Sequence, residues 1–288
     1  MIYLILVLLG LCMGSFVNAL VWRLHQQGSM SDAKPSKLKK SKANDTHNTV
    51  DQYSILRGRS MCVDCRHTLG AKDLLPVISW LSLGGKCRYC HAGISWQYPL
   101  VELLTAGLFL ASYIFWPYGF AVVGTLQLVF WLMLLVGLVA LAVYDIRWFL
   151  LPNRIVYPLV AIAAIQIFVV AVLTKDATVL MTAFWGAVFG GGIFYGLFQV
   201  SGGKWIGGGD VRLGFLLGLI VGGPLPSLLV LFLASFLGSL VAVPLLASKR
   251  LVRSSRMPFG PFLIVAAIIT QLFGSALISW YTQQFLQF

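Results

Sequence analysis

Long runs of apolar residues alternate with short polar segments along most of the chain, and this pattern predicts a bundle of membrane-spanning helices. A helix needs about 20 apolar residues to cross a bilayer. Runs that approach or reach this length lie at residues 1–22, 99–116, 119–143, 155–173, 178–199, 211–222, 225–247 and 258–280. We therefore predict an all-α polytopic membrane protein with about eight transmembrane segments.

Two of these runs carry further information. The first has no basic residue ahead of it and no small-residue cleavage site, so we expect it to remain as a helix. The run at 211–222 is too short, because about twelve residues at 1.5 Å each cannot cross roughly 30 Å of hydrocarbon. We expect a half-helix there. Interrupted helices are tolerated in membranes where they line a cavity, which is where a functional site would lie.

The longest polar segment, residues 23–98, separates the first helix (1–22) from a membrane-embedded core (99–288). Its first part, 26–53, is a Lys-rich insertion with almost no large apolar side chains. Such a composition cannot bury enough apolar surface to order itself, and it predicts disorder. Its second part, 57–94, contains four cysteines and predicts a small zinc-ribbon-like loop domain.

Composition and charge support the membrane interpretation and predict an orientation. The chain is 59% hydrophobic and 10% charged, with a mean hydropathy of +0.87, which excludes an ordinary soluble enzyme. Segment 23–98 holds twelve of the 21 Lys and Arg residues. If it is cytoplasmic, alternation puts every other basic residue except Lys175 on the same side, with the N-terminus outside. The net charge of +12 then reflects orientation and attraction to anionic lipid, without any nucleic acid.

The cysteines predict a metal site. They form two CxxC pairs, Cys62 with Cys65 and Cys87 with Cys90. Two such pairs supply the four thiolates of a closed, structural zinc tetrahedron. Redox chemistry is the alternative, although a cytoplasmic location argues against stable disulfides. His67 and His91 lie beside the pairs and could replace a cysteine, but we expect them to be solvated. We expect Cys12, in the first run, to be a buried packing residue.

Two carboxylates at helix ends are the candidate catalytic residues. Asp210 follows Gly207, Gly208 and Gly209 at the start of the short run, and Asp145 ends a long apolar run. Each has a simple alternative role, Asp210 as a helix N-cap and Asp145 as a partner of Arg147. The predicted topology nevertheless puts both at the cytoplasmic face, where a pair suggests an intramembrane aspartyl hydrolase. For Glu102, a hydrogen bond to a neighbouring helix or to the zinc loop is expected rather than catalysis.

Ordered motifs along nearly the whole chain resemble those of the type IV prepilin leader peptidases, which belong to the GxGD class of membrane aspartyl proteases. They are GSFVN (14–18), RGRSMCVDC (57–65), ISWL (78–81), GKCRYC (85–90), YPLVELL (98–104), Asp145, GGGD (207–210) and PFGP (258–261). Three features depart from the familiar pattern. Arg212 stands where Lys is usual, Leu-Pro-Asn at 151–153 replaces Ile-Pro-Asp, and the Lys-rich insertion is long.

The resemblance implies a function. Asp145 and Asp210 would be the catalytic pair and the four cysteines the zinc ligands. The substrates would be prepilins or pseudopilins, whose short basic leader is removed at the cytoplasmic face of the bacterial inner membrane. Many members also methylate the new N-terminus with S-adenosylmethionine. This activity rests on resemblance alone, because the chain has no glycine-rich strand-to-helix loop of the kind that cradles a nucleotide.

The residues suggest how cleavage would proceed. One carboxylate would keep a proton while the other activates water, and the roles of the two are left open. Gly207, Gly208 and Gly209 would let the substrate backbone lie alongside the enzyme. The competing hypothesis is a zinc-ribbon membrane transporter or receptor whose aspartates line an ion path. The oligomeric state is also left open.

Overall fold

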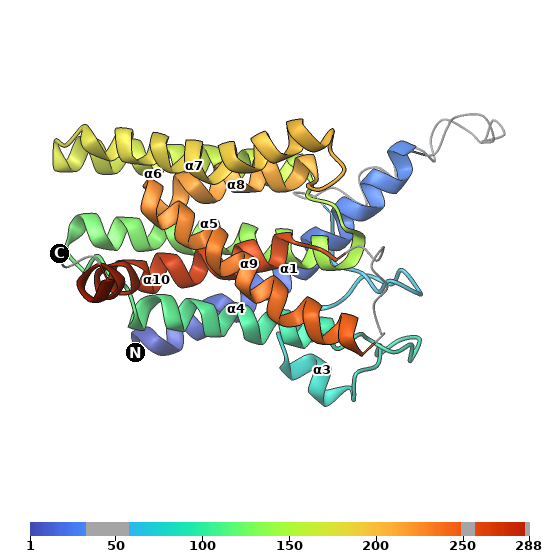
Figure 1. Cartoon of the computed structure of the whole chain (residues 1–288). Helices are drawn as coiled ribbons and strands as arrows, with labels where there is room; N and C mark the ends of the chain where they lie inside the picture. The colour runs from blue at the N-terminus through green and yellow to red at the C-terminus, as the bar shows by residue number, and fades with distance from the viewer. Residues whose placement is uncertain (33–57, 249–256, 286–288) are drawn as a thin grey trace. The chain divides into compact units, whose positions relative to one another are not determined.

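The computed structural model describes residues 1–32, 58–248 and 257–285, and these residues are mostly helical (Figure 1). Most of the predicted Lys-rich insertion lies outside the described residues. The elements are α1 (Ile2–Asp32), η1 (Ala71–Leu74), α3 (Ile78–Ser82), α4 (Gln97–Ile114), α5 (Val122–Trp148), α6 (Asn153–Thr174), α7 (Thr178–Ser201), α8 (Gly208–Val221), α9 (Pro224–Ala247) and α10 (Gly260–Phe285). The all-α prediction is confirmed.

Six of the described helices are long and apolar enough to cross a membrane: α1, α5, α6, α7, α9 and α10. The predicted runs at 99–116 and 211–222 form α4 and α8, which do not meet these criteria. The prediction of about eight transmembrane segments, one of them a half-helix, is therefore corrected to six candidate spans among the described residues, with the other two runs forming the shorter helices α4 and α8. At 14 residues, α8 extends only about 21 Å, as expected for a half-helix.

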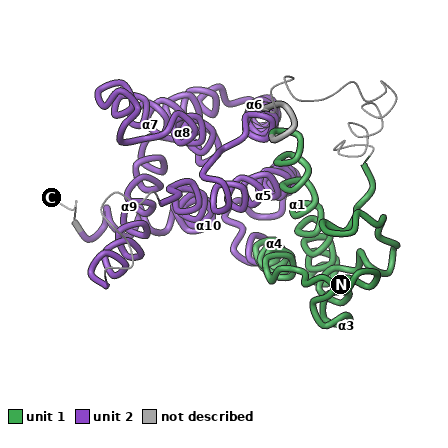
Figure 2. The backbone as a smooth tube through the Cα atoms, turned by 90° about the vertical axis from the view of Figure 1, so that its right-hand side faces the viewer, with its two compact units in different colours: residues 1–110 green, residues 111–288 purple. Residues whose placement is uncertain are grey.

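The chain divides into two compact units, residues 1–110 and 111–288, which are coloured separately in Figure 2. In the first unit, α1 continues to Asp32, beyond the predicted boundary at residue 22, so the first residues of the predicted insertion are helical. The α1 and α4 backbones pack closely. A Cβ added at Gly10 would lie 2.6 Å from the Ala106 Cα, and one at Gly14 would lie 2.6 Å from the Glu102 Cα.

Polar side chains extend this α1–α4 contact toward the start of α4. Asn18 donates to the Tyr98 carbonyl at 3.1 Å, and Gln97 donates to the Asn18 side chain at 3.3 Å. Small and polar residues are the usual means of joining helices in lipid, where apolar surface alone gives no preference for a protein neighbour. Cys12 is exposed on α1 rather than buried as predicted, because α4 covers the face of Gly10 and Gly14.

In the second unit, α7 and α8 lie side by side with their backbones in contact (Figure 1). Gly186 and Gly190 of α7 face Gly218 and Gly214 of α8, and a Cβ at any of these positions would overlap the opposite backbone. Ser227 of α9 donates to the Gly186 carbonyl at 2.9 Å. This spacing of four residues on each helix is a known close-packing pattern.

Candidate active site and metal centre

Asp145 lies in the last turn of α5 with only 5% of its surface exposed. Its Oδ2 accepts a hydrogen bond of 3.1 Å from the Gly260 backbone N–H, at the N-terminus of α10. The simpler interpretation, a pair with Arg147, is wrong, because the described residues show no ion pair between the two side chains. The Arg147 guanidinium instead lies 5.3 Å from the centre of the Trp148 ring. A buried carboxylate held by one backbone donor has accepting capacity left for another proton or a water.

Asp210 is the third residue of α8, not its N-cap as the simpler interpretation had it. Gly207 is the N-cap, since Gly208 and Gly209 already belong to the helix. The Asp210 carboxylate reaches back to accept a hydrogen bond from the Gly207 backbone N–H. It is also close enough to Asp145 for the two charges to repel each other. The carboxylate pair predicted from the sequence is therefore brought together inside the second unit.

Four helix ends meet around this pair: the C-terminus of α5 and the N-termini of α6, α8 and α10. Leu151, between α5 and α6, packs against two glycines. A Cβ at Gly209 would lie 3.2 Å from Leu151, and one at Gly260 would lie 3.6 Å from Leu151 and 2.6 Å from Asp145 Oδ2. A side chain at position 260 would therefore displace the Asp145 carboxylate. Helix N-termini carry partial positive charge, so those of α8 and α10 favour an anion at this point.

A polar link between α6 and α8 was not predicted from the sequence. The Arg212 guanidinium donates to the Asn153 side chain and, at 2.9 Å, to the Gly208 carbonyl. Asn153 is the first residue of α6, and Pro152 is the N-cap. A signal for this link was present in the sequence, because Arg212 and Asn153 are two of the departures from the familiar motifs. Only the fold shows that these two residues face each other.

The glycines before Asp210 have separate roles in the structure. Gly207 caps α8, Gly208 provides the carbonyl for Arg212, and Gly209 packs on Leu151. Nothing lies within 3.3 Å of a Cβ built at Gly207 or Gly208. Their predicted contact with a substrate backbone stays a prediction.

Cys62, Cys65, Cys87 and Cys90 lie together in the first unit, with all four Sγ atoms within 4.8 Å of one another. Cys62 and Cys90 Sγ are 3.8 Å apart. A zinc tetrahedron with Zn–S bonds of about 2.3 Å has S···S edges of about 3.8 Å, so the residues fit this ion. The backbone N–H of Cys90 is the main group that holds the pKa of the Cys87 thiol at about 7, which favours the thiolate that binds metal.

The two CxxC segments have the same backbone construction. In each, the carbonyl of the first cysteine accepts a hydrogen bond from the backbone N–H of the residue four positions later. That residue has a left-handed backbone conformation: Arg66 in one segment (φ 57°) and His91 in the other (φ 59°). The backbone N–H of each first cysteine also donates to the carbonyl of the residue five positions later. His91 is thus a corner residue, and His67 stacks on Tyr89 with ring centres 3.7 Å apart. Neither belongs to the cysteine cluster.

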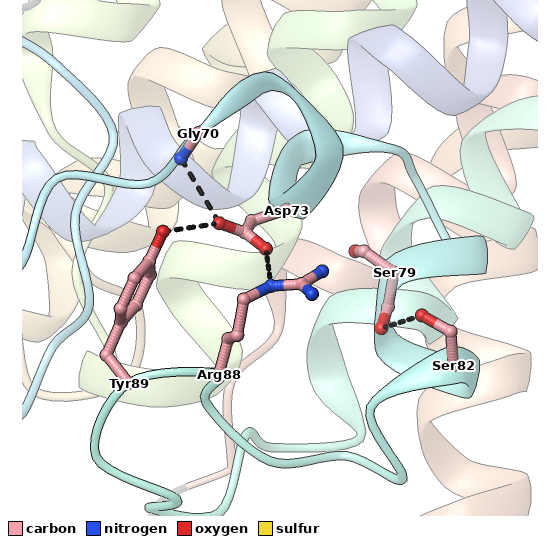
Figure 3. Close-up of polar contacts among 6 residues, drawn as sticks. All are labelled: Gly70, Asp73, Ser79, Ser82, Arg88 and Tyr89. Atoms are coloured by element: carbon pink, nitrogen blue, oxygen red, sulfur yellow. Dashed lines mark hydrogen bonds and ion pairs between the residues drawn. The ribbon is translucent and has the colours of Figure 1, made fainter.

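A polar network supports the second CxxC segment (Figure 3). The Asp73 carboxylate accepts hydrogen bonds from Arg88 at 2.7 Å, and from the Gly70 N–H and the Tyr89 hydroxyl at 3.2 Å each. The bond from Arg88 is the main cause that holds the pKa of the Asp73 carboxyl below its ordinary value. Because Arg88 and Tyr89 lie between the cysteine ligands, this network ties the metal segment to η1.

Glu102 belongs to the first unit, whereas Asp145 and Asp210 belong to the second. It is buried in α4, where it accepts hydrogen bonds from the Val77 backbone N–H at 2.7 Å and from the Ser15 side chain of α1. The expectation that Glu102 bonds a neighbouring helix or the zinc loop is confirmed on both counts.

Fold and sites together define a multi-pass membrane protein with a four-cysteine centre and a carboxylate pair at converging helix ends, with Asp145 buried and Asp210 half-buried. Residues 8–116 match the bacterial peptidase A24 N-terminal domain, and residues 132–243 match the type IV leader peptidase family. The chain is similar to relatives named prepilin leader peptidase/N-methyltransferase, at 32% identity in Pseudomonas aeruginosa and 33% in Stutzerimonas stutzeri, each covering 96% of this chain and 92% of the relative.

An Escherichia coli protein named type 4 prepilin-like proteins leader peptide-processing enzyme is 32% identical over 91% of this chain and 90% of its own length. No solved structure matches the chain. The chain belongs to the type IV leader peptidase family. This membership favours the enzyme interpretation over the transporter or receptor.

Proposed function

We propose that this protein is a membrane aspartyl endopeptidase that removes the leader from type IV prepilins and pseudopilins, with Asp145 and Asp210 as its catalytic residues. The observation that carries the proposal is the meeting of these two carboxylates at the ends of α5 and α8, beside the N-terminus of α10. Family membership supplies the substrate class.

The chemistry follows from the pair. Two carboxylates this close do not both ionise easily, so they share a proton. The ionised one takes a proton from water, which attacks the scissile carbonyl, while the protonated one donates to the developing oxyanion. The Gly260 N–H fixes one Asp145 oxygen, and the Gly207 N–H fixes Asp210. Both acids therefore stay oriented without a change of rotamer during the reaction.

We further propose an inner-membrane location with the zinc loop and the carboxylates facing the cytoplasm, based on the Lys and Arg distribution. Zinc would be held by Cys62, Cys65, Cys87 and Cys90. With four thiolates it has no open position, so its role is structural. The names of the relatives support a second activity, methylation of the new N-terminus with S-adenosylmethionine as cosubstrate.

The test is cleavage of a purified prepilin in detergent. Asp145→Asn and Asp210→Asn should each lower the rate at least about 1,000-fold, because an amide can neither act as base nor share the proton. Asp176→Asn is the matched control. Asp176 is an exposed carboxylate between α6 and α7 whose Oδ1 accepts from the Thr178 N–H, a bond that Asn preserves. Wild-type cleavage by either active-site variant would refute the proposed pair.

A further inference from the structure

Large apolar side chains are exposed around α3, in the metal-binding unit. They lie at the end of η1, just after it, in α3 and immediately before α4. They are Leu74, Leu75, Ile78, Leu81 and Trp96, which we call the α3 surface. Ile78, Leu81 and Trp96 are each more than 60% exposed. Apolar side chains gathered in this way mark a surface that contacts another protein or a membrane.

Hydrogen bonds fix the position of α3 along α1 and α4. The Val77 N–H, one residue before α3, donates to Glu102, which lies about 7 Å along the α4 axis from Gln97. Glu102 is packed against Gly14 of α1. The apolar membrane-span candidate in α1 covers Ile2–Gly28, so Gly14 is well inside it. The start of α3 is therefore level with the apolar part of α1.

The backbone at Val77 is strained to reach this position. Val77 has φ 61° and ψ −48°, and the Ile78 N–H bonds back to the Pro76 carbonyl, which makes a three-residue γ-turn. A β-branched residue rarely adopts this conformation. It persists because the buried Glu102 accepts the Val77 N–H. The turn brings α3 back against α4.

The α3 surface is also continuous with the exposed face of α4. Trp80 of α3 stacks on Trp96 with ring centres 4.2 Å apart, and its indole N–H donates to the Ile94 carbonyl. Beyond Trp96, the exposed side chains Leu100, Leu103 and Leu104 follow along α4, which packs on a membrane-span candidate. Tryptophan is enriched where a protein passes from lipid to water. The Trp80–Trp96 pair lies between the exposed leucines of α4 and the metal-binding loop, where such a boundary would fall.

Charge favours one kind of membrane surface. Residues 58–96 contain five Lys and Arg residues and two Asp. Asp73 is paired with Arg88, while Lys72 and Lys86 are exposed on either side of α3 in the sequence. An anionic leaflet attracts such a segment, and the attraction adds to the burial of apolar side chains.

We propose that the α3 surface is an interfacial docking element that inserts into the headgroup region of an anionic phospholipid leaflet. The metal-binding loop would then lie against the membrane, anchored through α3, and not extend freely from α4. This proposal concerns lipid contact and stands apart from the proposed peptidase activity.

The test is photocrosslinking in the full-length, zinc-containing protein, reconstituted in nanodiscs of phosphatidylglycerol and phosphatidylethanolamine. Benzoylphenylalanine replaces Leu81 in one variant and the exposed Asp64, in the first CxxC segment, in the control. We expect at least tenfold more lipid adduct at position 81 than at position 64, as measured by mass spectrometry. One zinc per chain in both variants would establish that the loop is folded.

Three outcomes would overturn the proposal. Equal lipid adducts at positions 81 and 64 would mean that α3 does not enter the headgroup region. A crosslinked dimer at position 81 would identify the α3 surface as a contact between copies. An adduct to a co-reconstituted prepilin, in place of lipid, would make it a substrate surface.

Discussion

The metal centre and the carboxylate pair are built in opposite ways. The cysteines come from two short segments with the same local hydrogen bonds, within 29 residues of one another. The carboxylate site takes Asp145, Asp210 and Gly260 from three helices spread over more than 100 residues. The first site depends on local turns and an ion. The second depends on how closely helices pack, which makes it sensitive to substitutions far from the carboxylates.

Removing the metal should have the largest effect on the first region. We expect one tightly bound zinc per chain, and none when Cys62, Cys65, Cys87 and Cys90 are all serine. Structural zinc contributes roughly 10 kcal/mol or more to folding in small domains, so the loop should open without it. Proteolysis within residues 58–96 should become much faster.

Cys12→Ser is the control for this experiment, because Cys12 is exposed on α1 and is not in the cluster. It should leave both zinc content and proteolysis unchanged. Metal analysis that finds no zinc in wild-type protein purified without chelators would contradict the structural assignment.

Adding one methyl group at the contact between α7 and α8 should disrupt the region of the carboxylate pair. A Cβ at Gly218 would lie 2.7 Å from the Gly186 carbonyl carbon and 2.9 Å from the Ala187 Cα, so α7 and α8 must separate. We expect Gly218→Ala to destabilise the protein by about 2 kcal/mol or more and to lower its melting temperature in detergent by several degrees. Cleavage should fall as well, because α8 carries Asp210.

Gly196→Ala provides the contrast on α7, since nothing lies within 4 Å of a Cβ there. In a helix, alanine is favoured over glycine by about 1 kcal/mol, so this variant should melt at the same temperature or slightly higher. Equal losses in both variants would mean that the close packing at position 218 is not the cause of the loss.

A smaller effect is expected at the link between α6 and α8. Arg212→Met removes the hydrogen bonds to Asn153 and the Gly208 carbonyl, and we expect kcat for prepilin cleavage to drop about tenfold. Asn153→Ala should behave similarly. If the two act as one link, the double variant should be no slower than the slower single variant. Independent, multiplying losses would show that they act separately.

The smallest effect concerns acid sensitivity of the metal-binding loop. Because the pKa of Asp73 is lowered in the folded protein, its contribution to stability is present above its unfolded pKa, about 3.9, and is lost as the pH falls below that value. Between pH 5 and 8, the loop should therefore melt at a slightly lower temperature in the Asp73→Asn variant than in the wild-type protein. This difference should shrink toward zero below about pH 4. The exposed Arg88 makes the effect small and sensitive to salt.

The sequence was most informative where a local pattern carries its own geometry. Two CxxC pairs predicted the cluster that the structure contains, since a tight turn between paired cysteines needs no distant partner. The short run at 211–222 predicted a half-helix for the same reason, because length alone prevents it from crossing the bilayer. The count of full spans was less accurate, because α4 combines an apolar stretch with polar residues at its start.

Only the tertiary structure could decide how distant residues combine. The amino-acid sequence determined that Asp145 and Asp210 lie at helix ends. That Gly260 donates to Asp145, that Arg212 faces Asn153, and that Val77 folds back to Glu102 depend on which helices are neighbours. In a chain this apolar, hydrophobic pattern fixes which segments are helices but distinguishes poorly between their faces. Small residues such as Gly186 and Gly218 instead determine which helices pack together, because they allow close backbone contact. These contacts form only when the helices are already adjacent, so the sequence alone does not reveal them.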